Sequence, residues 1–124
     1  MGYPEVDLGV CPAVVAPWLV RKVGAGRARM ILLTGGVVSG QRAFELGMVD
    51  RVVPSAAELD AAVDEVVQRL CTGGPHALRA TKKLLNELDG SDDGAVVRKG
   101  ADLSAQVVAM PETQSILRAK FAKV

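Results

Sequence analysis

The sequence predicts a mostly α-helical chain of about seven short elements, with one or two short strands. Two observations carry this prediction. Apolar residues recur every three to four positions along most of the chain, which is the period of one helix face. Residues 48–53 are the one convincing β-branched run, and a single strand cannot stand alone. The chain is therefore one small domain or part of a larger one.

The first dozen residues, interrupted by Pro4, Gly9 and Pro12, predict an extended segment or loop. This segment leads into a helix that starts near Pro12 or Pro17 and ends at Val23.

Two more short helices are expected before the strand. The first covers residues 27–33. The second begins after Ser39, whose side chain can cap the helix, and ends before Gly47, which is well placed as the left-handed residue. The strand follows at residues 48–53 and stops at Pro54.

The second half predicts four helices. Ser55 and Glu58 have the spacing of a capping box, in which each side chain bonds a free backbone amide. The apolar stripe of the helix that follows is Leu59, Val63, Val66, Val67 and Leu70. The remaining helices are expected from Pro75 to Asp89, over residues 95–110, and from Pro111 onward. The acidic turn at 89–94 fits only half of a calcium loop, and we interpret it as a cap for the next helix.

Composition and charge exclude several function classes. Fifteen Lys and Arg against fourteen Asp and Glu give a net charge of +1, so we expect no nucleic-acid or membrane partner. Cys11 and Cys71 lie sixty positions apart without a CxxC pair, which predicts no metal site, no disulfide framework and a cytoplasmic location. One Trp, one Tyr and two Phe leave the core to small aliphatic residues. Such a core buries little area, which suggests dependence on something outside the chain.

Few residues are candidates for chemistry. His76, the only histidine, follows Pro75 and is expected to be solvated. Glu5 differs, because it lies between Pro4 and Val6 in an apolar segment. A carboxylate that is partly removed from water there suits a general acid or base. Glu5 is therefore the candidate catalytic residue.

Three segments resemble the enoyl-CoA hydratase/isomerase (crotonase) superfamily. Residues 2–12, GYPEVDLGVCP, resemble its PEVxLGxxP segment. Residues 32–54, LLTGGVVSGQRAFELGMVDRVVP, resemble its LTGxxxSAxEAxxxGLVxxVVP block. Residues 13–24 lack the usual glycine-rich run and are closer to the PAVIxPYVVRxIG form of methylglutaconyl-CoA-hydratase-like members.

The resemblance implies the C-terminal portion of an α/β crotonase-like fold. Residues 1–54 would be the end of the core that holds the active-site glutamate, and residues 55–124 a helical oligomerisation and capping region. Glu5 matches the family's second catalytic carboxylate, and Val10 and Trp18 would form an acyl-pocket wall. The residues matching the family's CoA-contacting tail are Arg118, Lys120, Phe121 and Lys123, although the usual EKRxPxF pattern is absent.

The resemblance also implies a mechanism and partners. The substrate would be an acyl-CoA thioester, with coenzyme A as part of the substrate and no separate cofactor. An enolate would form at an oxyanion hole in a missing N-terminal half, which would also supply the first catalytic glutamate. The assembly would be a homotrimer or a hexamer. Hydration, isomerisation and hydrolysis all stay open.

Three hypotheses follow. The chain is a part of a crotonase-type enzyme, a non-catalytic helical oligomerisation module derived from that fold, or an unrelated helical binding domain.

Overall fold

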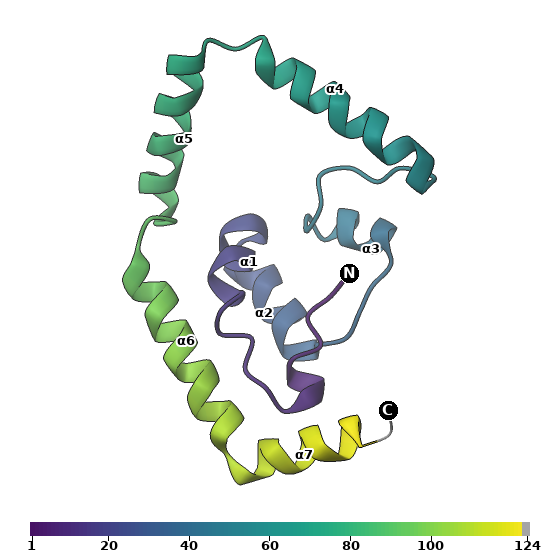
Figure 1. The fold of residues 1–124 in the computed structure, drawn as a ribbon, viewed down its shortest axis with the longest axis vertical. Coiled ribbons are helices and arrows are strands. Elements are labelled where there is room, and N and C mark those ends of the chain that lie inside the picture. The colour runs from purple at the N-terminus through teal and green to yellow at the C-terminus, as the bar shows by residue number, and fades with distance from the viewer. Residues whose placement is uncertain (123–124) are drawn as a thin grey trace. The chain divides into compact units, whose positions relative to one another are not determined.

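A computed structural model describes residues 1–122 of the chain (Figure 1). The expected mostly helical architecture is confirmed. The α-helices are α1 (Ala16–Val23), α2 (Ala25–Thr34), α3 (Gly40–Glu45), α4 (Leu59–Cys71), α5 (Pro75–Asp89), α6 (Gly94–Ala109) and α7 (Pro111–Phe121). Two short 3-10 turns are η1 (Val6–Leu8) and η2 (Ala56–Glu58).

The strand predicted at residues 48–53 is wrong. This segment is irregular, and the Met48 N–H donates to the Ala43 carbonyl of the preceding helix. Within residues 1–122 the β pairing consists of one isolated antiparallel bridge, between Gly2 and Val37. A β-branched run becomes a strand only when a neighbouring backbone takes its hydrogen bonds, and no described segment of this chain does so.

Local helix signals were predicted correctly at several ends. The Arg42 N–H donates to the Ser39 hydroxyl at 3.1 Å, as expected of an N-cap, and Gly47 takes a left-handed φ of 76° after α3. The Ala95 N–H donates to the Asp93 carboxylate at 2.9 Å, which confirms that the acidic turn caps the next helix.

The capping box predicted at residues 55–58 is wrong, because its two side chains do not bond the backbone amides. The Ser55 hydroxyl donates to Glu58 Oε1 at 2.9 Å, so the two side chains bond each other and not the backbone amides. The segment forms the 3-10 turn η2, and α4 begins only at Leu59.

The chain divides into two compact units. The first comprises residues 1–50 together with the described residues from Asp93 onward, and the second comprises Arg51–Asp92. The division at residue 54 that the resemblance implies concerns functional roles and stays a prediction.

Small aliphatic side chains form the core of the first unit, where α1 packs against α2. The buried apolar residues are Leu19, Ala28, Ile31, Leu32, Ala43, Leu46 and Met48. None of them is aromatic, as the composition indicates. The helix α6 belongs to the same unit, and its buried Gly100 lies against the Ala13 backbone.

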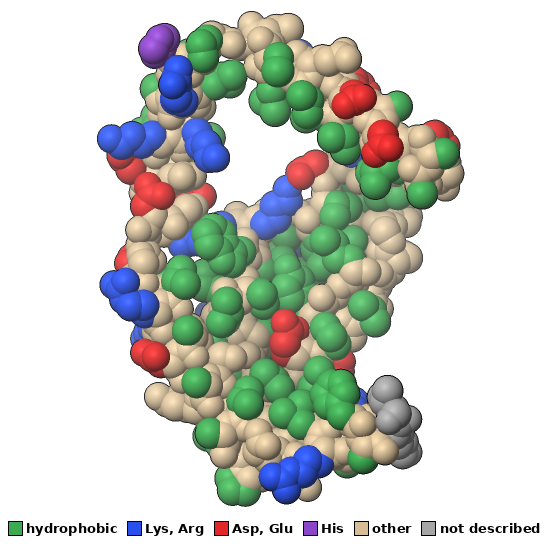
Figure 2. Space-filling view, in the orientation of Figure 1, with side chains coloured by type: hydrophobic (Ala, Val, Ile, Leu, Met, Phe, Trp, Pro, Cys, Tyr) green, Lys and Arg blue, Asp and Glu red, His purple; other side chains and the backbone are tan. Residues whose placement is uncertain are grey.

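The second unit exposes its apolar side chains. None of the residues of α4 or α5 is buried. The α4 stripe is about half exposed at Leu59, Val63, Val66, Val67 and Leu70, and α5 exposes Leu78, Leu84, Leu85 and Leu88. Figure 2 shows apolar side chains along α4. No helix in residues 1–122 combines the length and the apolar character needed to cross a bilayer.

We expect Gly100→Ala to lower the free energy of unfolding by up to about 2 kcal/mol. Its new Cβ would lie 2.5 Å from the Ala13 carbonyl oxygen. Such overpacking destabilises a fold by about 1–3 kcal/mol. Alanine forms a helix more favourably than glycine by roughly 1 kcal/mol, which offsets part of that loss.

Urea unfolding followed by circular dichroism measures this change. Gly26→Ala in α2 is the matched control, because its Cβ meets nothing within 4 Å and should leave stability unchanged or slightly raised. Equal stability of the two variants would contradict the packing of α6 on residue 13.

Candidate active site

Glu5 stands at the start of η1, in a loop that is closed by its own backbone. The Glu5 carbonyl accepts hydrogen bonds from the N–H groups of Leu8 at 3.0 Å and Val10 at 2.8 Å. We call residues 4–10 the Glu5 loop. These bonds make the loop one compact turn, so the glutamate has a defined backbone position.

The carboxylate of Glu5 is placed unusually. The residue is half-buried, and its Oε2 atom is buried without a hydrogen-bond partner. A buried polar atom without a partner is costly, and most proteins satisfy such atoms. An oxygen kept in this condition is available to bind or move a proton.

The helix α7 fixes the far end of the Glu5 loop. The Thr113 hydroxyl donates to the Gly9 carbonyl at 3.0 Å, and Thr113 is only 4% exposed. Ile116, one turn later on α7, also lies against Gly9.

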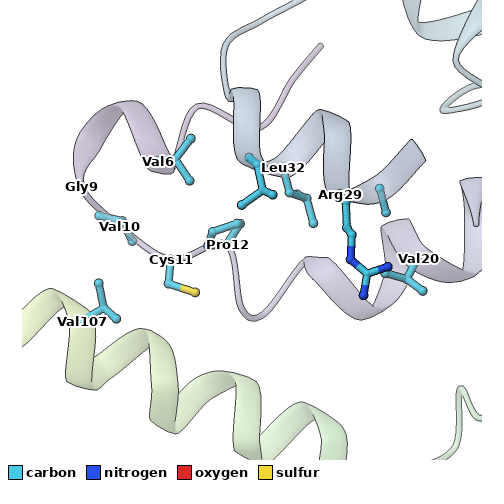
Figure 3. Close-up of a pocket in the computed structure, with 11 residues that line it drawn as sticks. Val6, Gly9, Val10, Cys11, Pro12, Val20, Arg29, Leu32 and Val107 are labelled. Atoms are coloured by element: carbon cyan, nitrogen blue, oxygen red, sulfur yellow. The ribbon is translucent and has the colours of Figure 1, made fainter. Parts of the chain in front are cut away.

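An apolar hollow of about 570 Å³ adjoins the Glu5 loop. Its lining residues are Val6, Gly9, Val10, Cys11 and Pro12 from the N-terminal segment, Val20, Ala28, Arg29, Leu32 and Leu33 from α1 and α2, and Val107 from α6. Figure 3 shows Val107 on the helix that faces the Val10–Cys11 segment. The only charged side chain in this lining is that of Arg29. We call this cavity the apolar hollow.

Of the two residues that the resemblance places in an acyl-pocket wall, one lines the apolar hollow. Val10 lines the apolar hollow. Trp18 on α1 is not among the lining residues; it is half exposed, and the Arg21 guanidinium lies 4.8 Å from its ring centroid. The roles of both residues stay predictions.

The basic and aromatic tail lies at the far end of α7 from Thr113. Arg118, Lys120 and Phe121 are exposed, and Lys123 lies outside the described residues. The contact of this tail with CoA stays a prediction.

Other candidate groups are dispersed. His76 is exposed, as expected. Cys11 and Cys71 are free thiols, one in the wall of the apolar hollow and one exposed. Within residues 1–122 no group of three or more His, Cys, Asp or Glu side chains could hold a metal ion. Glu5 itself is not among the residues that line the apolar hollow, although Val6, Gly9 and Val10 of the Glu5 loop are. Its role stays a prediction.

A protein-family model described as enoyl-CoA hydratase/isomerase matches residues 1–120. The chain belongs to the enoyl-CoA hydratase/isomerase family. A Thermus thermophilus protein named "Putative enoyl-CoA hydratase" is 36% identical over 125 residues, which cover 99% of this chain and 48% of that relative. A crotonyl-CoA hydratase of Syntrophomonas wolfei is 37% identical over 87 residues, which cover 69% of this chain and 33% of that relative.

Solved structures of the family share the fold. The crystal structure of "a putative enoyl-CoA hydratase" from Streptomyces avermitilis matches with a TM-score of 0.87 at 33% identity, over 98% of this chain and 44% of that one. This likeness confirms the predicted crotonase-like fold class. The hypothesis of an unrelated helical binding domain is wrong. The chain spans about half the length of the Thermus relative and of the Streptomyces structure.

Sequence reasoning missed two side chains that hold the Glu5 loop, Asp7 and Thr113. Thr113 is 104 positions from the carbonyl that it binds, and no local pattern signals so distant a contact. Asp7 accepts a hydrogen bond from the Gly36 N–H, 29 positions away. The proximity of Asp7 to Glu5 in the sequence was the available signal for it.

We expect Thr113→Val to lower the free energy of unfolding by about 1–3 kcal/mol, because the Gly9 carbonyl loses a buried donor while the side-chain shape is kept. Chemical unfolding measures the change. Thr81→Val on the exposed face of α5 is the control and should stay within about 0.5 kcal/mol of the parent. A Thr113→Val variant that also stays within that range would contradict the assigned bond.

Proposed function

We propose that this chain is the glutamate-bearing part of an enoyl-CoA hydratase/isomerase-type enzyme that acts on acyl-CoA thioesters. The observation that carries the proposal is Glu5, whose Oε2 is buried and unpartnered in a loop that lines an apolar hollow. Relatives named for hydration of crotonyl-CoA and 2,3-dehydroadipyl-CoA support this substrate class.

Glu5 would move the proton at C2 of the acyl group. When a base removes that proton, the C–H electron pair moves toward the thioester carbonyl and an enolate forms; protonation at C2 reverses the step. Hydrogen-bond donors aimed at the enolate oxygen lower the barrier, and each is worth about a hundredfold to a thousandfold in turnover.

We place these donors on a polypeptide segment equivalent to the part of the relatives that this chain does not span. Coverage of 44–48% of the Streptomyces structure and the Thermus relative supports a second contributing segment. The same segment would supply the other catalytic carboxylate. Coenzyme A would enter as part of the substrate, with no additional cofactor.

The acyl chain would occupy the apolar hollow next to Val10, because an apolar lining favours a hydrocarbon group. Trp18 would extend that wall, and Lys120 and Phe121 would contact CoA. The two free cysteines suit a cytoplasmic enzyme.

One carboxylate at this position suits two reactions. Double-bond isomerisation can run on Glu5 alone, which removes a proton and returns it. Hydration of a 2-enoyl-CoA needs a second carboxylate to orient the water while Glu5 protonates C2. Which carboxylates are present in the assembled protein therefore decides the reaction.

We expect the purified 124-residue chain to show no hydration of crotonyl-CoA, because a carboxylate without oxyanion donors supplies only part of the catalysis. Adding the N-terminal half of the Thermus relative should restore turnover, measured by the loss of enoyl-thioester absorbance. In the restored complex, Glu5→Gln should lower kcat by about a hundredfold or more.

Glu87→Gln, on exposed α5, is the control and should retain full turnover. Robust turnover by the chain alone that Glu5→Gln abolishes would contradict the need for a second segment. Full turnover of a restored Glu5→Gln complex would contradict the role of Glu5.

The alternative function is a non-catalytic helical oligomerisation module, as a trimer or a hexamer. The observation that favours it is the exposed apolar stripe on each of α4 and α5. Contiguous apolar surface of this kind marks association sites. Oligomerisation on adding the N-terminal half, without any turnover, would support this alternative.

We expect Val66→Asp to weaken self-association, because a charge placed in the α4 stripe must be removed from water on contact. Light scattering coupled to size-exclusion chromatography should show a trimer or hexamer for the parent and a smaller species for the variant. Gln68→Asp adds the same charge to α4 outside the stripe and should leave the mass unchanged. A monomeric parent at tens of micromolar would contradict the oligomer.

A further inference from the structure

We propose that Asp7 is a positioning residue for Glu5, an inference that rests on the proposed function of Glu5. The Gly36 N–H donates to Asp7 Oδ2 at 2.7 Å, across 29 positions of sequence. A hydrogen bond to an ionised carboxylate at this distance is of the short, charge-assisted kind. It joins η1 to the connection between α2 and α3.

Gly36 holds the segment on both sides of Glu5. Its N–H donates to Asp7, and its carbonyl accepts the Tyr3 N–H at 3.1 Å. Glu5 lies midway between these two attachment points. One residue of the α2–α3 connection, Gly36, therefore fixes both flanks of the carboxylate-bearing residue through its N–H and its carbonyl.

The contact leaves no room for a side chain between the two turns. Gly35 and Gly36 have φ angles of 64° and 77°, in the left-handed region. A Cβ on Gly35 would lie 2.7 Å from Val6 Cγ2 and 2.8 Å from Asp7 Oδ1. Gly35 thus lies directly against η1.

The η1 turn transmits the position of Asp7 to Glu5. The Asp7 N–H donates to the Pro4 carbonyl at 3.1 Å, and the Glu5 carbonyl accepts from Leu8 and Val10. These bonds tie the residues on either side of Glu5 to one another. A shift of Asp7 therefore moves the Glu5 backbone with it.

The Asp7 side chain itself is exposed, so its hydrogen bond contributes little to folding. The expected role is orientation. Misplacing a catalytic group by about 1 Å can cost about a hundredfold in rate, even when the fold survives. Asp7 should therefore affect Glu5 more than it affects stability.

The test uses NMR of the full chain, which needs no activity. In Asp7→Ala we expect the Gly36 amide to exchange with solvent at least tenfold faster, and the Glu5 side chain to change from one χ1 rotamer to several. Asp7→Asn retains an acceptor oxygen and should preserve the single Glu5 rotamer. Asp60→Ala on α4 is the control and should change neither signal.

A Glu5 rotamer that stays single after the Gly36 bond is lost would overturn the proposal. If Asp7→Ala unfolds the chain, Asp7→Asn provides the test. A Gly36 amide that stays protected from exchange while Glu5 samples several χ1 rotamers would overturn the proposal. A protected Gly36 amide together with a single Glu5 rotamer would support it. In the complex restored with the N-terminal half, Asp7→Ala should lower kcat at least tenfold and leave KM unchanged. Failure of the Glu5 function itself would show separately, as full turnover in the Glu5→Gln complex.

Discussion

The two hydrogen bonds of Gly36, one with Asp7 and one with Tyr3, attach the Glu5 loop and the residue before it to the helical part of the unit. The connection that carries Gly36 follows α2 directly, and α2 is anchored by Ile31 and Leu32 in the core. The position of the glutamate therefore depends on how α2 packs against α1. Because one of the two bonds joins main-chain groups only, it depends on backbone geometry and not on side-chain identity. On the opposite side, α7 supplies the hydroxyl of Thr113.

The sequence predicted those elements whose signals are local. Ser39 caps its helix because hydroxyl and amide lie within one turn, and Pro75 begins α5 because its fixed φ suits a first helical residue. Glu5 was likewise chosen as the candidate from its immediate neighbours and from a motif that surrounds it, and its catalytic role stays a prediction. In each case the residues that decide the structure lie within a few positions of one another.

The predictions that were wrong concern segments whose structure depends on distant residues or on competing hydrogen bonds. Residues 48–53 have strand propensity, but propensity acts only when a partner backbone is present. Ser55 and Glu58 have the right spacing for a capping box, and their side chains bond each other instead. No local sequence pattern predicted the role of Thr113, because the Gly9 carbonyl that accepts its hydrogen bond lies 104 positions away.

The α4 stripe has a consequence for the shape of whatever covers it. Leu59, Val63, Val66 and Leu70 follow one another at steps of four, three and four residues. The same steps occur in the seam of a left-handed coiled coil, in which side chains of one helix insert into gaps of another, and Val67 makes the α4 stripe wider than such a seam. Helices that meet along such a seam cross at about 20°. A helix lying nearly along α4 is therefore one neighbour whose side chains this spacing would accommodate.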